Sequence, residues 1–161
     1  MSYTPLKNNK PPIVISLLLF LCAAAAIIFY ALRIGHDFIL QIIAVITSAA
    51  AISVTARYGL TTFTYTLDKD GFRVIRTHMI TGNSKTVCSI SFEAAVSVIP
   101  KAPMKEIRNK YGKIMKRYNY RVNMFPETQY YYIFDFGGSL HIIEFEANSA
   151  FLDMVKLFTN N

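Results

Sequence analysis

The sequence contains few of the residues from which catalytic and metal sites are built. It has only three histidines and two cysteines in 161 residues. His36 lies in a short polar turn, while His78 and His141 lie in separate strand-like segments with no second ligand at metal-binding spacing. A serine in a nucleophile elbow, a glycine-rich phosphate loop and a pair of catalytic carboxylates are also missing. These absences predict a protein that is not an enzyme and that holds no metal or cofactor.

The two cysteines do not indicate a disulfide. Cys22 lies in a long apolar run, and Cys88 lies in a strand-like segment far along the chain. A reducing compartment is therefore compatible with the sequence.

Charge is missing from two long apolar runs, residues 13–32 and 38–56. At about 1.5 Å per helical residue, each run is long enough to cross a hydrocarbon core of about 30 Å. The five residues between them, 33–37, include two charges and a glycine, which suits a turn. We therefore predict a two-helix transmembrane hairpin over residues 13–56. Because neither run contains an ionisable side chain, an ion pathway is not expected.

The basic residues near the hairpin predict its orientation. Lys7 and Lys10 precede the first run and Arg57 follows the second, whereas the turn contains only Arg33. This distribution predicts a multi-pass protein of the cell membrane with both termini in the cytoplasm. A cleaved signal peptide is the alternative for the first run, but a second run follows at once. Residues 1–12 are polar and contain proline, so we expect a flexible tail there.

Small residues lie near the middle of both apolar runs, at 23–26 and 48–51. Such residues let two helix backbones approach closely without polar contacts. Self-association into a homo-oligomer through the same faces is compatible with this pattern.

From residue 60 onward, apolar and polar residues alternate, which is the pattern of β-strands. Seven strands are predicted, over residues 60–67, 72–79, 84–92, 96–100, 117–124, 129–136 and 140–146. Val87 and Cys88 interrupt the alternation of the third strand, which indicates a bulge or another register. A final helix is predicted from Asn148 or Ser149, because apolar residues then recur at helical spacing.

Three stretches of this region resemble the bacterial branch of the pleckstrin-homology-like family. They are YTLDKDGFRV at 65–74, SISFEAAVSVIP at 89–100 and YNYRVNMFPETQYYYIFDF at 118–136. The resemblance implies an α+β domain over residues 57–161, a seven-stranded bent barrel capped by the C-terminal helix. It also fits the preceding hairpin, because one or two membrane spans often precede such a domain in bacterial proteins.

The first predicted turn departs from the pattern of domains that bind inositol phosphates. Asp68 and Asp70 flank Lys69, so this turn is acidic on balance. Arg73 and Arg76 are three residues apart on a strand and are expected on opposite faces. Specific phosphoinositide binding is therefore not expected at this turn.

One segment carries the net charge of +7. Within the insertion 101–117 and the four residues after it, eight basic residues accompany a single acidic one, Glu106. The candidate membrane-surface contacts are Lys105, Arg108, Lys110, Lys113, Lys116 and Arg117. Met104, Ile107, Tyr111, Ile114 and Tyr118 recur at helical spacing, so a basic amphipathic helix is one interpretation. Because Gly112 weakens a helix, a bent helix or an extended hairpin stays open, as does a solvated insertion whose apolar residues cap the core.

The sequence thus predicts a membrane-anchored, non-catalytic interaction module. We expect its domain to dock a protein partner through an unpaired strand edge or a groove beside the last helix. The alternative is anionic-lipid surface sensing by the basic segment 104–118, with salt-sensitive binding. Nucleic acid is not an expected partner, because the basic excess is confined to one short segment.

Overall fold

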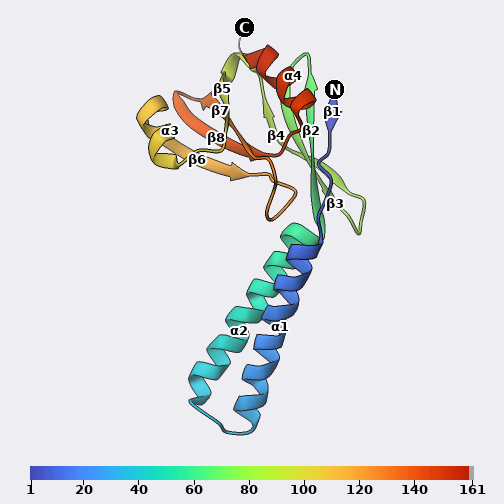
Figure 1. The fold of residues 1–161 in the computed structure, drawn as a ribbon, viewed down its shortest axis with the longest axis vertical. Coiled ribbons are helices and arrows are strands. Elements are labelled where there is room, and N and C mark those ends of the chain that lie inside the picture. The colour runs from blue at the N-terminus through green and yellow to red at the C-terminus, as the bar shows by residue number, and fades with distance from the viewer. Residues whose placement is uncertain (160–161) are drawn as a thin grey trace. The chain divides into compact units, whose positions relative to one another are not determined.

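A computed structural model of the chain describes residues 1–159 and divides it into two compact units (Figure 1). The hairpin unit comprises Asn8–Thr61, and the sheet unit comprises Met1–Lys7 together with Thr62–Asn161.

The hairpin unit consists of two long apolar helices. Helix α1 covers Lys10–Ala31, and α2 covers Asp37–Val54 and continues into a π-helical turn, Thr55–Gly59. Their candidate spans are 22 and 23 residues long with mean hydropathies of 2.8 and 2.1, so both are long and apolar enough to cross a membrane. Helix α1 begins three residues before the predicted run, because prolines fit the first turn of a helix, where the backbone N–H groups have no partner.

The two helices pack through their small residues, as the sequence predicted. Ser16, Ala23 and Ala26 of α1 are buried, as is Ala51 of α2. The Thr55 hydroxyl donates to Ser16 Oγ at 2.9 Å. Large apolar side chains point outward instead.

The first sheet of the sheet unit has the strand order β1-β2-β3-β4. Its strands are β1 (Ser2–Tyr3), β2 (Thr61–Asp68), β3 (Gly71–His78) and β4 (Ser84–Ile90). Val74 pairs with Cys88 and Ile75 with Thr86, so Val87 is an extra residue on β4. The bulge predicted from Val87 and Cys88 is therefore confirmed.

The prediction of a flexible tail over residues 1–12 is wrong at both of its ends. Ser2 pairs with Thr66 and Tyr3 with Tyr65, so the start of the chain is an edge strand. The Tyr3 ring stacks on Phe151, with 5.3 Å between ring centroids. An aromatic side chain that packs on the core offsets the entropy of ordering this short strand. At the other end, helix α1 already includes residues 10–12.

The second sheet has the order β5-β7-β8-β6. It is built from β5 (Ala95–Pro100), β6 (Ile114–Asn119), β7 (Tyr130–Phe136) and β8 (Ser139–Phe145), with the 3-10 turn Phe92–Ala94 before β5. Strand β6 runs parallel to β8, whereas β5 and β8 are antiparallel to β7. Two helices complete the unit, α3 (Met104–Tyr111) and α4 (Ser149–Thr159).

The basic segment changes structure at Gly112. Helix α3 ends there because Gly112 adopts a φ of +91°, and the chain enters β6 two residues later. The strand predicted over 117–124 therefore lies earlier in the chain than expected, and the segment 104–118 is a short helix followed by a strand.

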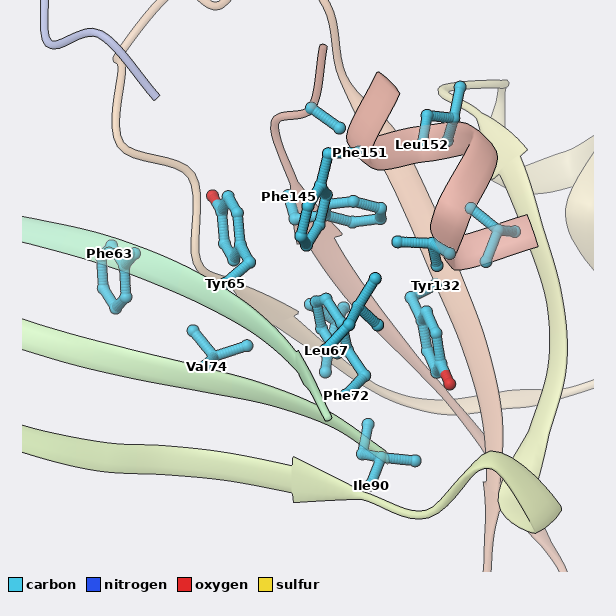
Figure 2. Packing of buried hydrophobic residues seen from close by; sticks show 14 of the residues in the cluster. Phe63, Tyr65, Leu67, Phe72, Val74, Ile90, Tyr132, Phe145, Phe151 and Leu152 are labelled. Carbon is cyan, nitrogen blue, oxygen red and sulfur yellow. The ribbon is translucent and has the colours of Figure 1, made fainter. Parts of the chain in front are cut away.

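The main core lies between the two sheets. Figure 2 shows Phe63, Tyr65, Leu67 and Phe72 of the first sheet packed against Tyr132 and Phe145 of the second. Phe151, Leu152 and Val155 of α4 join the same cluster. The described residues thus form an α+β unit with two four-stranded sheets that do not close into a barrel.

Candidate functional site

A cleft lies where the two sheets fail to close. Strand β4 ends the first sheet and β6 ends the second, and both border this opening. Its volume is about 330 Å³, near the lower end of the range for ligand pockets. It is lined by Val87, Cys88, Ser89, Ile90, Ser91, Ala94, Tyr118, Tyr120, Phe134, Asp135 and Phe136.

Aromatic side chains dominate the wall that the second sheet provides. Alternation along β7 directs Tyr132 and Phe134 into the core, and Phe136 follows them at the mouth of the cleft. Phe136 is 72% exposed. The rings of Tyr118 and Tyr120 stack with 6.1 Å between their centroids, and both residues line the same cleft. The site therefore presents a ready apolar surface to a ligand.

Two buried polar atoms behind the lining of the cleft lack a hydrogen-bond partner within residues 1–159. They are the Tyr132 hydroxyl and His141 Nδ1. Burial, followed by the nearby Cys88, raises the pKa of Tyr132, so its hydroxyl is a neutral donor or acceptor. The His141 ring lies among Tyr118, Phe134 and Phe136, which line the cleft.

An unpaired buried polar group costs about 1–3 kcal/mol, so both atoms favour a bound water or a polar ligand group. Figure 2 shows the Tyr132 hydroxyl on the side of the ring away from α4. The apolar wall of the cleft thus has two buried groups able to hydrogen-bond behind it.

Cys88 lines the same cleft and is half-buried. Burial raises the pKa of its thiol above the ordinary value of 9.0. The thiol is therefore largely protonated near neutral pH, which is typical of a structural cysteine and not of a nucleophile.

Helix α3, the first part of the basic segment 104–118, lies on the outer face of the second sheet, and β6, its second part, is a strand of that sheet. Ile107 of α3 is 2% exposed and packs with Ile114, Tyr131, Ile133 and Ile142. The apolar side of this helix therefore covers the sheet, as in the interpretation of a capping insertion. Tyr118, which shares the helical spacing, lies instead on the inner face with Tyr120.

The structure separates the six candidate membrane contacts. Lys105, Arg108 and Lys110 lie on α3, Lys113 follows its end, and Lys116 lies on β6, all of them exposed. Arg117 is exposed as well, but its charge is ion-paired with Glu144. Five of the six thus present charge to solvent, and their contact with lipid stays a prediction.

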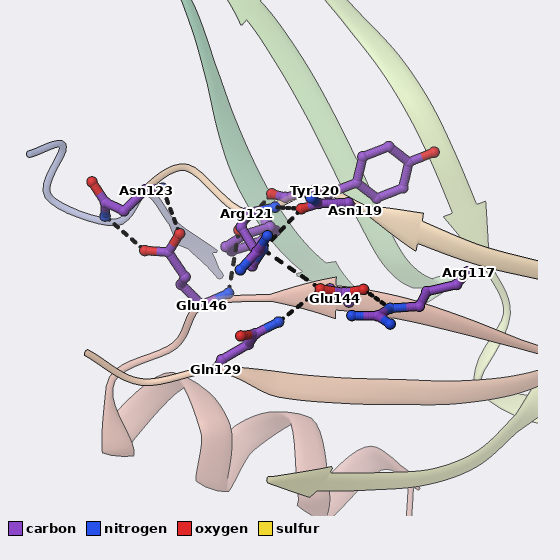
Figure 3. A network of polar contacts seen from close by, with 9 residues as sticks. Arg117, Asn119, Tyr120, Arg121, Asn123, Gln129, Glu144 and Glu146 are labelled. Atoms are coloured by element: carbon purple, nitrogen blue, oxygen red, sulfur yellow. Dashed lines mark hydrogen bonds and ion pairs between the residues drawn. The ribbon is translucent and has the colours of Figure 1, made fainter. Parts of the chain in front are cut away.

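A buried acidic network, which the sequence did not indicate, holds the chain around β6. Glu144 is 2% exposed and contacts Arg117, Arg121 and Gln129 (Figure 3). Glu146 accepts hydrogen bonds from both the backbone N–H and the side-chain amide of Asn123, at 2.6 and 2.7 Å.

This network depends on the parallel pairing of β6 with β8, which places Asn119 opposite Glu144. The signal in the sequence is a pair of acidic residues at the end of a largely apolar run, Glu144 in β8 and Glu146 just after it. Their partners follow from the order of the strands, which alternation does not reveal.

Two further features concern a possible metal site and the first hairpin. Residues 1–159 hold no group of three or more His, Cys, Asp or Glu side chains placed to bind a metal. In the first hairpin, Arg73 forms ion pairs with Asp68 at 3.3 Å and with Asp70 at 3.2 Å, so its positive charge is balanced by two neighbouring carboxylates.

The fold and the cleft define a class of protein, a two-sheet α+β unit joined to an apolar two-helix hairpin. In comparisons with known proteins, no family model, curated protein or solved structure matches the chain.

Proposed function

We propose that this chain is a membrane-anchored, non-catalytic interaction module. Its hairpin spans the cell membrane, and its sheet unit docks a protein partner on the cytoplasmic side. The observation that carries the proposal is the aromatic cleft between β4 and β6.

The distribution of side chains on the hairpin supports membrane anchoring. Small residues are buried between the helices, while Leu17, Leu18, Val45 and Ile46 are all more than half exposed. In water, such a continuous apolar surface would favour aggregation, whereas lipid tails solvate it. Lys7, Lys10 and Arg57 near the open end of the hairpin favour a cytoplasmic location for the sheet unit.

The order of strands supports a pleckstrin-homology-like domain. Seven strands, β2 to β8, precede one C-terminal helix, and they form two sheets that pack face to face. This sequence of elements is the one that the resemblance implies. The chain differs from that pattern by its additional strand β1, by helix α3 and by the opening between β4 and β6. It also differs in the second sheet, which β5 joins and in which β6 runs parallel to β8.

An extended peptide with a large apolar side chain suits the cleft best. The aromatic wall would contact the large side chain of that peptide. Strand β4 has a free edge, but Lys85 and the bulge at Val87 discourage long strand pairing. The partner is therefore expected to bind through one or two anchor side chains more than through added strands.

Site-specific photocrosslinking tests this proposal in the full chain. We expect p-benzoylphenylalanine in place of Phe136 to form an adduct with one partner protein, because this residue lies at the mouth of the cleft. The same probe in place of Val96, which is 41% exposed on the opposite edge strand β5, is the matched control and should form no such adduct.

A variant that fills the cleft makes the test specific. Ala94→Phe adds a large side chain to the lining and should reduce the adduct from position 136 at least severalfold. Equal adducts from positions 96 and 136, or an adduct that Ala94→Phe leaves unchanged, would show that the partner binds elsewhere.

Anionic-lipid surface sensing by segment 104–118 is the second candidate, favoured by its five exposed cations. It predicts that Lys110→Ser, Lys113→Ser and Lys116→Ser together reduce contact of this segment with vesicles containing phosphatidylglycerol. Accessibility of a spin label at position 109 of the reconstituted chain would measure that contact. Raised salt should have the same effect as the substitutions, because the attraction is electrostatic. Arg117 is left in place because its ion pair with Glu144 is structural.

A further inference from the structure

We infer that a second surface of the sheet unit contacts the lipid bilayer directly. This surface, the apolar rim, consists of Leu6, Met79, Ile80 and Phe125. The inference rests on the proposed membrane anchoring and adds the way in which the sheet unit meets the membrane.

The rim residues are large, apolar and strongly exposed. Leu6 is 94% exposed, Ile80 71%, Phe125 67% and Met79 52%. They come from three separate segments: the chain after β1, the turn between β3 and β4, and the loop between β6 and β7. A group of such side chains on one end of a folded unit marks a contact surface.

Contacts within the sheet unit bring these three segments together. The Asn123 side-chain amide donates to the Leu6 carbonyl at 2.9 Å, which joins the β6–β7 loop to the N-terminal segment. Lys7 Nζ lies 3.0 Å from Met79 Sδ, which joins the same segment to the β3–β4 turn. Figure 1 shows that the β3–β4 turn and the β6–β7 loop lie at the same end of the sheet unit. The N-terminal segment runs from β1 to that end.

The covalent chain identifies the bilayer as the occupant. Leu6 lies four residues before Lys10, where α1 begins, and four residues of extended chain reach at most about 14 Å. Strand β2 starts at Thr61, directly after the helical turn that continues α2. Strand β3 runs antiparallel to β2. Its last residues, followed by Met79 and Ile80, therefore return to the end of the sheet unit at which β2 starts. Both connections to the apolar helices therefore leave from the end that carries the rim.

The chemistry of the rim fits a membrane interface. Aliphatic and aromatic side chains partition to the boundary between headgroups and acyl chains, and neighbouring cations attract anionic lipid. Lys7 supplies one such cation, and Lys101 supplies another at the base of the β6–β7 loop, where its backbone N–H donates to the Gln129 carbonyl. The rim is therefore a point of insertion that would hold the sheet unit in a fixed orientation.

Spin labels on the full chain, reconstituted in vesicles of phosphatidylcholine and phosphatidylglycerol, test the inference. Single cysteines at positions 80, 125, 136 and 46 are made in a Cys22→Ala, Cys88→Ala background. For each label we compare its accessibility to oxygen, which dissolves in lipid, with its accessibility to a water-soluble nickel chelate. The ratio of the two reports how deeply the label lies in the bilayer. We expect positions 80 and 125 to show a raised ratio relative to position 136. That position is equally exposed, but it lies at the far end of β7 from the loop that carries Phe125.

Position 46, on the exposed face of α2, reports separately on anchoring. A lipid signal at 46 with aqueous signals at 80 and 125 would overturn the rim contact and leave the anchor standing. An aqueous signal at 46 would instead contradict the proposed anchor. Labels at 80 and 125 that are shielded from both oxygen and nickel would show that protein covers the rim, which also overturns the inference.

Discussion

Replacing Gly71 with alanine is expected to destabilise the sheet unit by about 3 kcal/mol or more. Gly71 has a φ of +148°, and a Cβ built there would lie 2.0 Å from the Ile90 carbonyl oxygen and 2.8 Å from its carbon. Both atoms belong to the backbone of β4, so the overlap is relieved only if a strand moves. Strain of the dihedral and overpacking each cost about 1–3 kcal/mol. Urea unfolding of the full chain in mild detergent, followed by near-ultraviolet circular dichroism of the tyrosines, measures the loss.

Gly82→Ala is the matched control. Gly82 also has a positive φ, +68°, but nothing lies within 4 Å of its built Cβ. Only the cost of placing an alanine in the left-handed region remains, about 1–2 kcal/mol. If both variants lose the same stability, the close approach of Gly71 to β4 is not a constraint on the fold.

Gly71 also shows how far the sequence alone leads. The run Asp68, Lys69, Asp70, Gly71 between two alternating segments predicted a turn with glycine at a position of positive φ. The structure confirms this turn, in which Asp68 Oδ1 accepts from the N–H groups of Asp70 and Gly71. The contact with Ile90 was not predictable, because it depends on a residue that is distant in sequence and on the path of β4.

The same contrast holds for the strands. Of the eight strands within residues 1–159, alternation predicted seven, because each runs for six residues or more. One of the seven was misplaced, since the prediction over 117–124 overlaps β6 only at its last three residues. Strand β1 was missed because two residues carry no periodic pattern, and its order comes from pairing with β2 and from the ring contact of Tyr3. The helical spacing of 104–118 continued past Gly112, but the glycine ended the helix and the last residue of the pattern, Tyr118, lies on the inner face of β6.

The candidate site was still less visible in the sequence. A free strand edge was expected, but the cleft arises from the failure of β4 and β6 to meet, which is a property of two strands about 30 residues apart. Its aromatic wall appeared as ordinary strand alternation in the run 130–136. The unpaired atoms of Tyr132 and His141 depend on the environment that the fold creates around them.

Glu144→Ala is expected to lower the free energy of unfolding by about 3 kcal/mol. Urea unfolding of the full chain in mild detergent, as for Gly71→Ala, measures this loss. Glu144 is 2% exposed and is held by Arg117, by Arg121 at 3.5 Å and by Gln129 at 2.7 Å. Removing one partner of a buried ion pair costs about 3–5 kcal/mol. The lower end applies here, because Arg117 is 44% exposed and regains water when its partner is lost.

Asp135→Ala is the control of the same chemistry on the neighbouring strand. The carboxylate of Asp135 is exposed and accepts one hydrogen bond, from the Gly138 N–H at 2.8 Å, so its loss should cost about 1 kcal/mol or less. Glu144→Gln should fall between the two, because the amide oxygen still accepts a hydrogen bond while the charge is gone. A Glu144→Ala variant as stable as Asp135→Ala would mean that apolar packing alone holds β6.

The outcome for Glu144 bears on the cleft as well as on stability. Strand β6 contributes Tyr118 to the cleft wall, and Tyr120 follows the end of the strand. Glu144 is ion-paired with the two arginines on either side of this stretch, Arg117 and Arg121. If the acidic network fixes this strand, then Glu144→Ala should weaken the photocrosslink from position 136 under conditions in which the rest of the unit is folded. If the crosslink persists despite lost stability, the cleft is shaped by Phe134 and Phe136 of β7, and Glu144 stabilises the fold without positioning the binding surface.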